Sequence, residues 1–257
     1  MPIPSHSPSS KPQLKLALLL GAASALATLA VFPYIVANIP PGPVSARHPI
    51  WVIALIAAIQ TGVLFWLLAW IGLRLGASHG LDAPWLRAWV YRTALPSMRP
   101  RWLMAASGGV VLGLLVIGAD AISPHPSSPA FSATGLAWRG ALAALYGGTA
   151  EEILCRLFVV STLVWLLAWI RRGMARPWMF ITAITLAGLL FGLGHLPGAF
   201  AMGMPHSFMT IVRVVPLNAL LGLFYGGLYW RLSLEHAMLA HFSTDIVVHG
   251  IWPLFIG

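Results

Sequence analysis

Long apolar stretches dominate this chain, and their length limits what it can fold into. Seven of them can be marked by residue number: 14–37, 50–75, 102–122, 135–170, 178–196, 207–232 and 234–256. Most reach the roughly 20 residues that an α-helix needs to cross a hydrocarbon core of about 30 Å. Their apolar residues are continuous rather than alternating, which argues against an outer-membrane β-barrel. We expect an all-α, polytopic bundle of about 7–8 transmembrane helices.

The charged residues lie mostly between the apolar stretches. Only 8% of the chain is charged, yet fifteen Lys and Arg against six acids give a formal charge of +9. These cations form no dense basic patch, so their placement follows the positive-inside rule and implies no nucleic-acid partner. We expect an integral protein of the bacterial inner (cytoplasmic) membrane, with the lipid bilayer as its surroundings, the N-terminus in the cytoplasm and the C-terminus outside.

The sequence predicts one membrane domain, 14–257, behind a disordered Pro/Ser-rich tail at 1–13. No internal repeat is evident. Arginine and tryptophan residues between the second and third stretches predict a helix lying in the membrane interface. The stretch 135–170 would exceed roughly 50 Å as one helix, so we expect it to tilt or to break near Gly147 and Gly148. Cys155 is the single cysteine, which excludes an intramolecular disulfide.

Two of the six acids stand next to each other in the apolar segment EEILCR, residues 151–156. A charged side chain near a bilayer centre costs roughly 2.5–3.5 kcal/mol on insertion scales, so such acids are candidate functional groups. Glu152 and Arg156 are four residues apart on a helix and share a face, where they can pair. Glu151 points about 100° away from that face. One acid is therefore neutralised and one is left available.

Two later apolar stretches carry histidines. The segment FGLGH runs from Phe191 to His195, and HFSTD places His241 and Asp245 four residues apart, with His249 one turn further on. Lipid would reject all of these polar groups, so we expect them to converge with EEILCR on one interior polar cavity.

Each motif also has a simpler structural explanation. Glu152 with Arg156 alone is more often a structural ion pair than a catalytic group. His195 alone is more often an interior histidine with its hydrogen bonds satisfied. His241 with Asp245 alone fits a helix contact or a transport pathway equally well. Three such motifs in this order on apolar helices favour the functional interpretation.

Together the three motifs resemble those of the type II CAAX prenyl endopeptidases and their bacterial bacteriocin-processing (CPBP, Abi) relatives, a family of glutamic-type intramembrane proteases. The resemblance covers roughly 136–250 and rests on one arginine, two glutamates, a phenylalanine, two histidines and an aspartate: Arg156, Glu151, Glu152, Phe191, His195, His241 and Asp245. It implies that Glu151 and His195 activate a water molecule and that His241 and Asp245 stabilise the oxyanion.

The chain departs from the family pattern at two positions. Cys155 stands before the arginine where an aromatic residue is usual, which changes packing. Asp245 stands where the eukaryotic enzymes carry Asn, and an ionised Asp cannot donate a hydrogen bond to an oxyanion. It would need to be protonated, or to orient His241 instead. A prenylated substrate is therefore not implied.

The chemistry of peptide hydrolysis suits these residue types, because it needs a base for water and donors aimed at the developing oxyanion. We expect Glu151, the acid away from the arginine, to be the base, with His195 holding the same water. His241 would stabilise the tetrahedral intermediate, and Glu152 with Arg156 would support the site. The substrate would be a membrane-associated protein or peptide, and neither a metal nor another cofactor is required.

Two alternatives stay open at this point. Carboxylates and imidazoles also describe a zinc-dependent protease, although the chain lacks H-E-x-x-H and spaces His236 and His241 five apart, off a common helix face. A proton-coupled transporter or a non-catalytic scaffold would use the same buried groups, but the paired halves typical of transporters are not evident.

Depth in the membrane raises a difficulty for a shared site. Counted from the ends of the predicted spans, His195 lies near the outer edge, whereas His241 lies about two turns from the inner turn. A broken helix or a re-entrant segment around 197–205 would bring the two histidines level.

Overall fold

The computed structural model describes residues 13–41, 47–121 and 132–256, so the expected tail lies outside the described residues except for Gln13. All regular structure among the described residues is helical, which confirms the all-α class. The elements are α1 (Leu14–Asn38), α2 (Ile50–Gly76), η1 (Ala77–His79), α3 (Pro84–Tyr91), α4 (Trp102–Ala121), α5 (Ala133–Tyr146), η2 (Gly147–Glu151), η3 (Ile153–Val160), α6 (Ser161–Ile170), α7 (Pro177–Gly194), α8 (Leu196–Ala201), α9 (Phe208–Arg231), α10 (Leu234–Asp245), η4 (Ile246–Ile251) and α11 (Pro253–Ile256). Here η1 is a 3₁₀ turn, and η2, η3 and η4 are π-helical.

Six helices among the described residues are long and apolar enough to cross a membrane, so the chain is an integral membrane protein. They are Leu14–Asn38, Ile50–His79, Trp102–Ala119, Ala133–Ile170, Pro177–Ala201 and Phe208–Arg231. The seventh predicted stretch, 234–256, is formed by α10, η4 and α11, which follow one another with only Trp252 between the last two, and it is not among these six spans.

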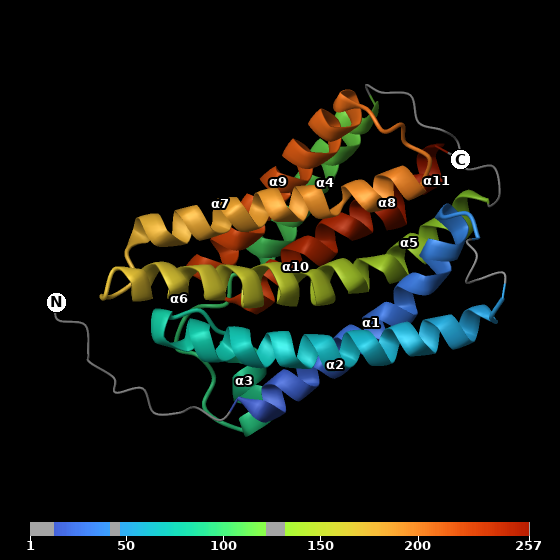
Figure 1. Cartoon of the computed structure of the whole chain (residues 1–257). Helices are drawn as coiled ribbons and strands as arrows, with labels where there is room; N and C mark the ends of the chain where they lie inside the picture. The colour runs from blue at the N-terminus through green and yellow to red at the C-terminus, as the bar shows by residue number, and fades with distance from the viewer. Residues whose placement is uncertain (1–12, 42–46, 122–131, 257) are drawn as a thin grey trace.

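The helices form one bundle with α10 enclosed in it (Figure 1). α1 packs along α2 on one side, and the long helix made of α5, η2, η3 and α6 crosses the middle. α7 packs along α9 on the other side. α10 contacts α4, α9, α5 and η2, which places the third motif against the first.

Glycines allow several of these helices to pack closely. Where α7 meets α9, a Cβ on Gly222 would lie 2.8 Å from the Cα of Gly188. Gly192, one turn further along α7, lies against the backbone of Val215. Small residues at such crossings let two backbones approach and gain van der Waals contact, which is the main attraction between helices in lipid.

The segment from Ala133 to Ile170 runs as a single helix of 38 residues and does not break at Gly147 and Gly148. Those two glycines instead begin the π-helical part, which continues with one α-helical residue through Val160. A π-helix carries one extra residue per hydrogen-bonded turn and is frequent at functional sites.

The loop before α4 holds the buried start of α10. The predicted interfacial helix is α3, and its Leu86 N–H donates to Glu235 Oε1 at 2.8 Å. The N–H of Leu234 donates to the Asp82 carbonyl at 3.2 Å, and the N–H of Arg101 donates to His236 Nε2 at 3.2 Å. α10 therefore begins beneath this loop and not at the level where α7 begins.

This offset resolves the difficulty over depth without a re-entrant segment. His195 is the C-cap of α7, and α8 (Leu196–Ala201) follows it directly, so the span continues beyond His195 to Ala201. α10 begins part of the way along α7 (Figure 1). The ring of Phe191 consequently contacts both His195 and His241.

Candidate active site

Glu152 forms the buried centre of a polar cluster between the long helix and α10. Its Oε1 lies 3.0 Å from Arg156 Nη1 and accepts a hydrogen bond from His241 Nδ1 at 2.7 Å. The Glu152 side chain is fully buried, and those of Arg156 and His241 are 2% and 4% exposed. The ion pair expected within EEILCR is present, and the contact with His241 adds a second partner. Removing one partner of such a buried pair typically costs about 3–5 kcal/mol.

Glu151 lies beside this cluster but is less enclosed. Its side chain is 28% exposed, and its Oε2 is 3.8 Å from His241 Nε2. Asp245 is 17% exposed, with its Oδ2 at 3.6 Å from the same nitrogen. Both distances exceed the roughly 3.2 Å limit of an N–H···O hydrogen bond. His241 therefore bonds to Glu152 through Nδ1 and presents Nε2 to two further carboxylates.

Two aromatic rings hold His241 and Arg156. The ring of Tyr225 stacks on His241 with centroids 4.6 Å apart and planes at 17°. The Arg156 guanidinium lies 4.7 Å from the Phe191 ring centroid and 5.1 Å from that of Tyr225. Cation–π contacts of this kind contribute about 2 kcal/mol when desolvated. The Tyr225 hydroxyl donates a hydrogen bond to Thr244 Oγ1 at 2.7 Å. The tyrosine is therefore held both by its ring, which stacks on His241, and by its hydroxyl.

His195 joins the cluster through Phe191. Its Nδ1 lies 2.8 Å from the Phe191 carbonyl, and its ring meets the Phe191 ring edge to face with centroids 4.6 Å apart. Since a carbonyl only accepts, Nδ1 carries the proton and Nε2 of the neutral ring carries the lone pair. Phe191 in turn meets the His241 ring at 5.6 Å.

Gly147 gives the cluster its close fit. A Cβ on Gly147 would overlap with Asp245 Oδ2 and lie 3.1 Å from His241 Nε2. The backbone of η2 thus passes directly over the imidazole and carboxylate of α10, which leaves no room for a side chain at this position.

Four residues that contact the cluster were not predicted from the sequence: Tyr225, Thr244, Gly147 and Gly222. Gly222 accepts from Arg156 Nη2 through its carbonyl at 3.3 Å. A tyrosine in the middle of an apolar stretch, away from the interface where tyrosines gather, was the available signal for Tyr225. His249 was expected on the stripe of His241, but its Nδ1 lies 3.4 Å from the Tyr34 hydroxyl of α1.

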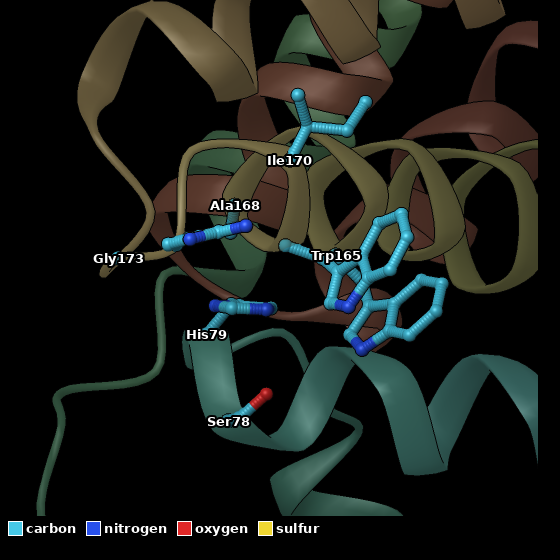
Figure 2. Close-up of a pocket in the computed structure, with 8 residues that line it drawn as sticks. Ser78, His79, Trp165, Ala168, Ile170 and Gly173 are labelled. Carbon is cyan, nitrogen blue, oxygen red and sulfur yellow. The ribbon is translucent and has the colours of Figure 1, made fainter.

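Two further observations concern ligands. Among the described residues, no three His, Cys, Asp or Glu side chains are arranged to hold a metal ion. A hollow of about 770 Å³ lies away from the cluster, between η1 and the end of α6, and Figure 2 shows Ser78, His79 and Trp165 at its wall. The C-terminal ends of α2 and α6 flank this hollow, and Arg172 is one of the residues that line it.

Comparison with known proteins gives one match. Residues 133–247 match the family model described as type II CAAX prenyl endopeptidase Rce1-like, which is a little under half of the chain. The matched segment runs from the start of α5 into η4 and contains all three motifs. Searches of curated proteins and of solved structures found no match.

Proposed function

We propose that the chain, whose residues 133–247 form a domain of the Rce1-like type II CAAX prenyl endopeptidase family, hydrolyses a peptide bond in a membrane-associated protein or peptide. Members of this family are glutamate-dependent intramembrane proteases, and the chain is an enzyme of that class. One observation carries the proposal for the site. Arg156 and His241 both engage Glu152, which leaves Glu151 as the partly exposed acid beside the imidazole.

Glu151 acts as the general base and His195 holds the same water. A water molecule has two hydrogens, one for the Glu151 carboxylate and one for the lone pair on His195 Nε2. Its oxygen then attacks the carbonyl carbon while one proton passes to Glu151. The same proton later goes to the leaving amine as the C–N bond breaks, so the base returns to its charged form.

His241 stabilises the oxyanion of the tetrahedral intermediate. Its Nδ1–H is held by Glu152, so a proton on Nε2 makes the ring an imidazolium that donates toward the oxyanion. Asp245 at 3.6 Å and Glu151 at 3.8 Å favour that positive charge. Asp245 therefore orients and charges His241, which removes the need for Asp245 itself to donate.

The experiment uses the purified full-length protein in detergent with membrane-associated peptides. We expect Glu151→Gln and His195→Ala to lower the cleavage rate at least about 100-fold, the lower range for a lost general base. Glu235→Gln is the matched control, because it removes a carboxylate outside the cluster while its amide oxygen still accepts from Leu86 N–H. Full activity of Glu151→Gln, with the protein accumulating normally, would remove Glu151 from the mechanism.

A chelator distinguishes the zinc-dependent alternative. We expect EDTA to leave the cleavage rate essentially unchanged, because carboxylate and imidazole groups supply the base and the oxyanion donor. Strong inhibition that added zinc reverses would replace this mechanism with a metal-dependent one. Proton flux without cleavage of any peptide would favour a transporter.

The substrate and the orientation need separate tests. Matched peptides with and without a prenyl group decide whether the family description extends to this substrate. Comparing peptide products of cells with active protein and with Glu151→Gln identifies the natural one. We also propose that the basic ends of the helices face the cytoplasm and that the C-terminus lies on the opposite side of the membrane. A reporter fused after Gly257 should then be detected outside the cytoplasm. The expected location is a bacterial cytoplasmic membrane.

A further inference from the structure

A groove of about 640 Å³ opens between the start of α4 and the end of α9. These helices lie next to each other at the back of the bundle in Figure 1. The groove is separate from the carboxylate and imidazole cluster, and it has a charged end and an apolar wall.

The charged end is formed by Arg101 and Arg231. Neither guanidinium has a carboxylate within ion-pair distance among the residues that the structure describes. Arg231 lies in the last turn of α9, with its guanidinium 3.9 Å from the Trp230 ring centroid. Arg101 directly precedes the first turn of α4, where backbone N–H groups lack helical acceptors and favour an anion.

The apolar wall extends from the arginines toward the bundle centre. Met104 and Leu223 are 44% and 39% exposed and line it. The ring of Phe224 packs over Gly108 and closes the inner end. From Arg231 to Leu223 the wall is about 12 Å long by helical rise. Gly227 lies on the same wall, and a Cβ there would have no atom within 4 Å, so the groove is open above it.

We infer that this groove binds an anionic phospholipid, with the phosphate between Arg101 and Arg231 and part of one acyl chain along α9. Charge complementarity selects the anion, because two unpaired guanidinium groups and a helix N-terminus converge on one end. The apolar wall selects an amphiphile over free phosphate. The arginines also lie at the basic end of the bundle, where the positive-inside rule and the anionic cytoplasmic leaflet coincide.

A lipid in this groove would connect two helices that hold the catalytic cluster. Just beyond the inner end, the Gly109 carbonyl of α4 accepts from Thr244 Oγ1 at 2.9 Å. Tyr225 of α9 donates to the same hydroxyl at 2.7 Å. The bound lipid would therefore stabilise the α4–α9 junction on which the position of α10 depends.

Binding is measured on the full-length protein, without reference to proteolysis. Protein in phosphatidylcholine vesicles receives spin-labelled phosphatidylglycerol or spin-labelled phosphatidylcholine, and the motionally restricted fraction gives the relative affinity. We expect phosphatidylglycerol to be preferred, and Arg101→Gln and Arg231→Gln each to lower that preference about five-fold. Arg171→Gln, which removes a charge at the same end but outside the groove, should leave it unchanged. Gly227→Leu should lower it by filling the groove.

Thermal unfolding provides a second readout that a misfolded variant cannot imitate. Added phosphatidylglycerol should raise the Tm of the wild type and of Arg171→Gln, but not of Gly227→Leu, whose own Tm shows that it folds. The inference would be overturned if phosphatidylglycerol and phosphatidylcholine showed the same motionally restricted fraction. It would also be overturned if Arg171→Gln lowered the preference for phosphatidylglycerol as much as Arg101→Gln and Arg231→Gln do. Displacement of the labelled lipid by glycerol 3-phosphate would also overturn it, because the ligand would then be a soluble phosphate.

Discussion

Replacing Gly147 by alanine tests whether the polar cluster is the site of catalysis. The new Cβ would overlap with Asp245 Oδ2 and lie 3.1 Å from His241 Nε2. The Asp245 carboxylate must then move by roughly 1 Å or more to regain van der Waals distance. A misplacement of about 1 Å in an active site can cost about 100-fold in rate. We expect kcat to fall by about that factor.

The change in stability should be much smaller than the change in rate. Overpacking costs about 1–3 kcal/mol, and alanine returns up to about 1 kcal/mol of helix propensity, so Gly147→Ala should remain folded. Gly118→Ala is the matched control, since a Cβ at Gly118 meets nothing within 4 Å. Peptide cleavage and thermal unfolding are measured for both variants in the same detergent.

A second variant identifies the cause. Asp245→Ala removes the group that the new Cβ displaces. The losses in kcat, expressed as activation free energies, should therefore be less than additive: the double variant should lose less than the sum of the two single variants. Wild-type kcat in a folded Gly147→Ala protein would refute the reasoning, because the catalytic groups would then not depend on this helix contact.

Three further predictions concern the surroundings of the cluster. Arg156→Met should lower the free energy of unfolding by about 3–5 kcal/mol, measured by denaturant titration in mixed micelles, because it leaves the Glu152 carboxylate short of a partner. Tyr225→Phe keeps the ring on His241 but loses the hydrogen bond to Thr244, so unfolding should become easier by only about 0.5–1.5 kcal/mol. A drop as large as that of Arg156→Met would contradict this division of roles. EDTA should leave peptide cleavage unchanged, and a loss that zinc restores would contradict the metal-independent mechanism.

The sequence predicted those features of the site that depend on helical spacing. Glu152 and Arg156 are four residues apart, so their pairing follows from the period of one helix, and it is present even where the helix widens to π geometry. The family match over 133–247 likewise confirms the resemblance based on the three motifs. The catalytic roles given to Glu151, His195, and the other site residues stay predictions.

Contacts between different helices could not be predicted from the sequence. The bond between His241 and Glu152 joins residues 89 positions apart, and no periodicity specifies it. The length of the stretch 135–170 predicted a tilt or a break near Gly147 and Gly148, but the helix is continuous, and Gly147 admits the close approach of α10. The apparent mismatch in depth came from assuming that helices begin at one level, whereas α10 begins beneath the loop at Asp82.

The buried start of α10 has a consequence for how this enzyme can be divided. Leu234 and His236 are fully buried, and they bond to backbone groups of Asp82 and Arg101, which precede the family-matched segment. His241 lies on the same helix, seven residues after Leu234 and five after His236. Without the backbone groups of Asp82 and Arg101, the start of that helix would lose these two hydrogen bonds. The motif-free first half of the chain is thus not dispensable to the site, because it supplies the main-chain acceptor and donor that hold the start of α10.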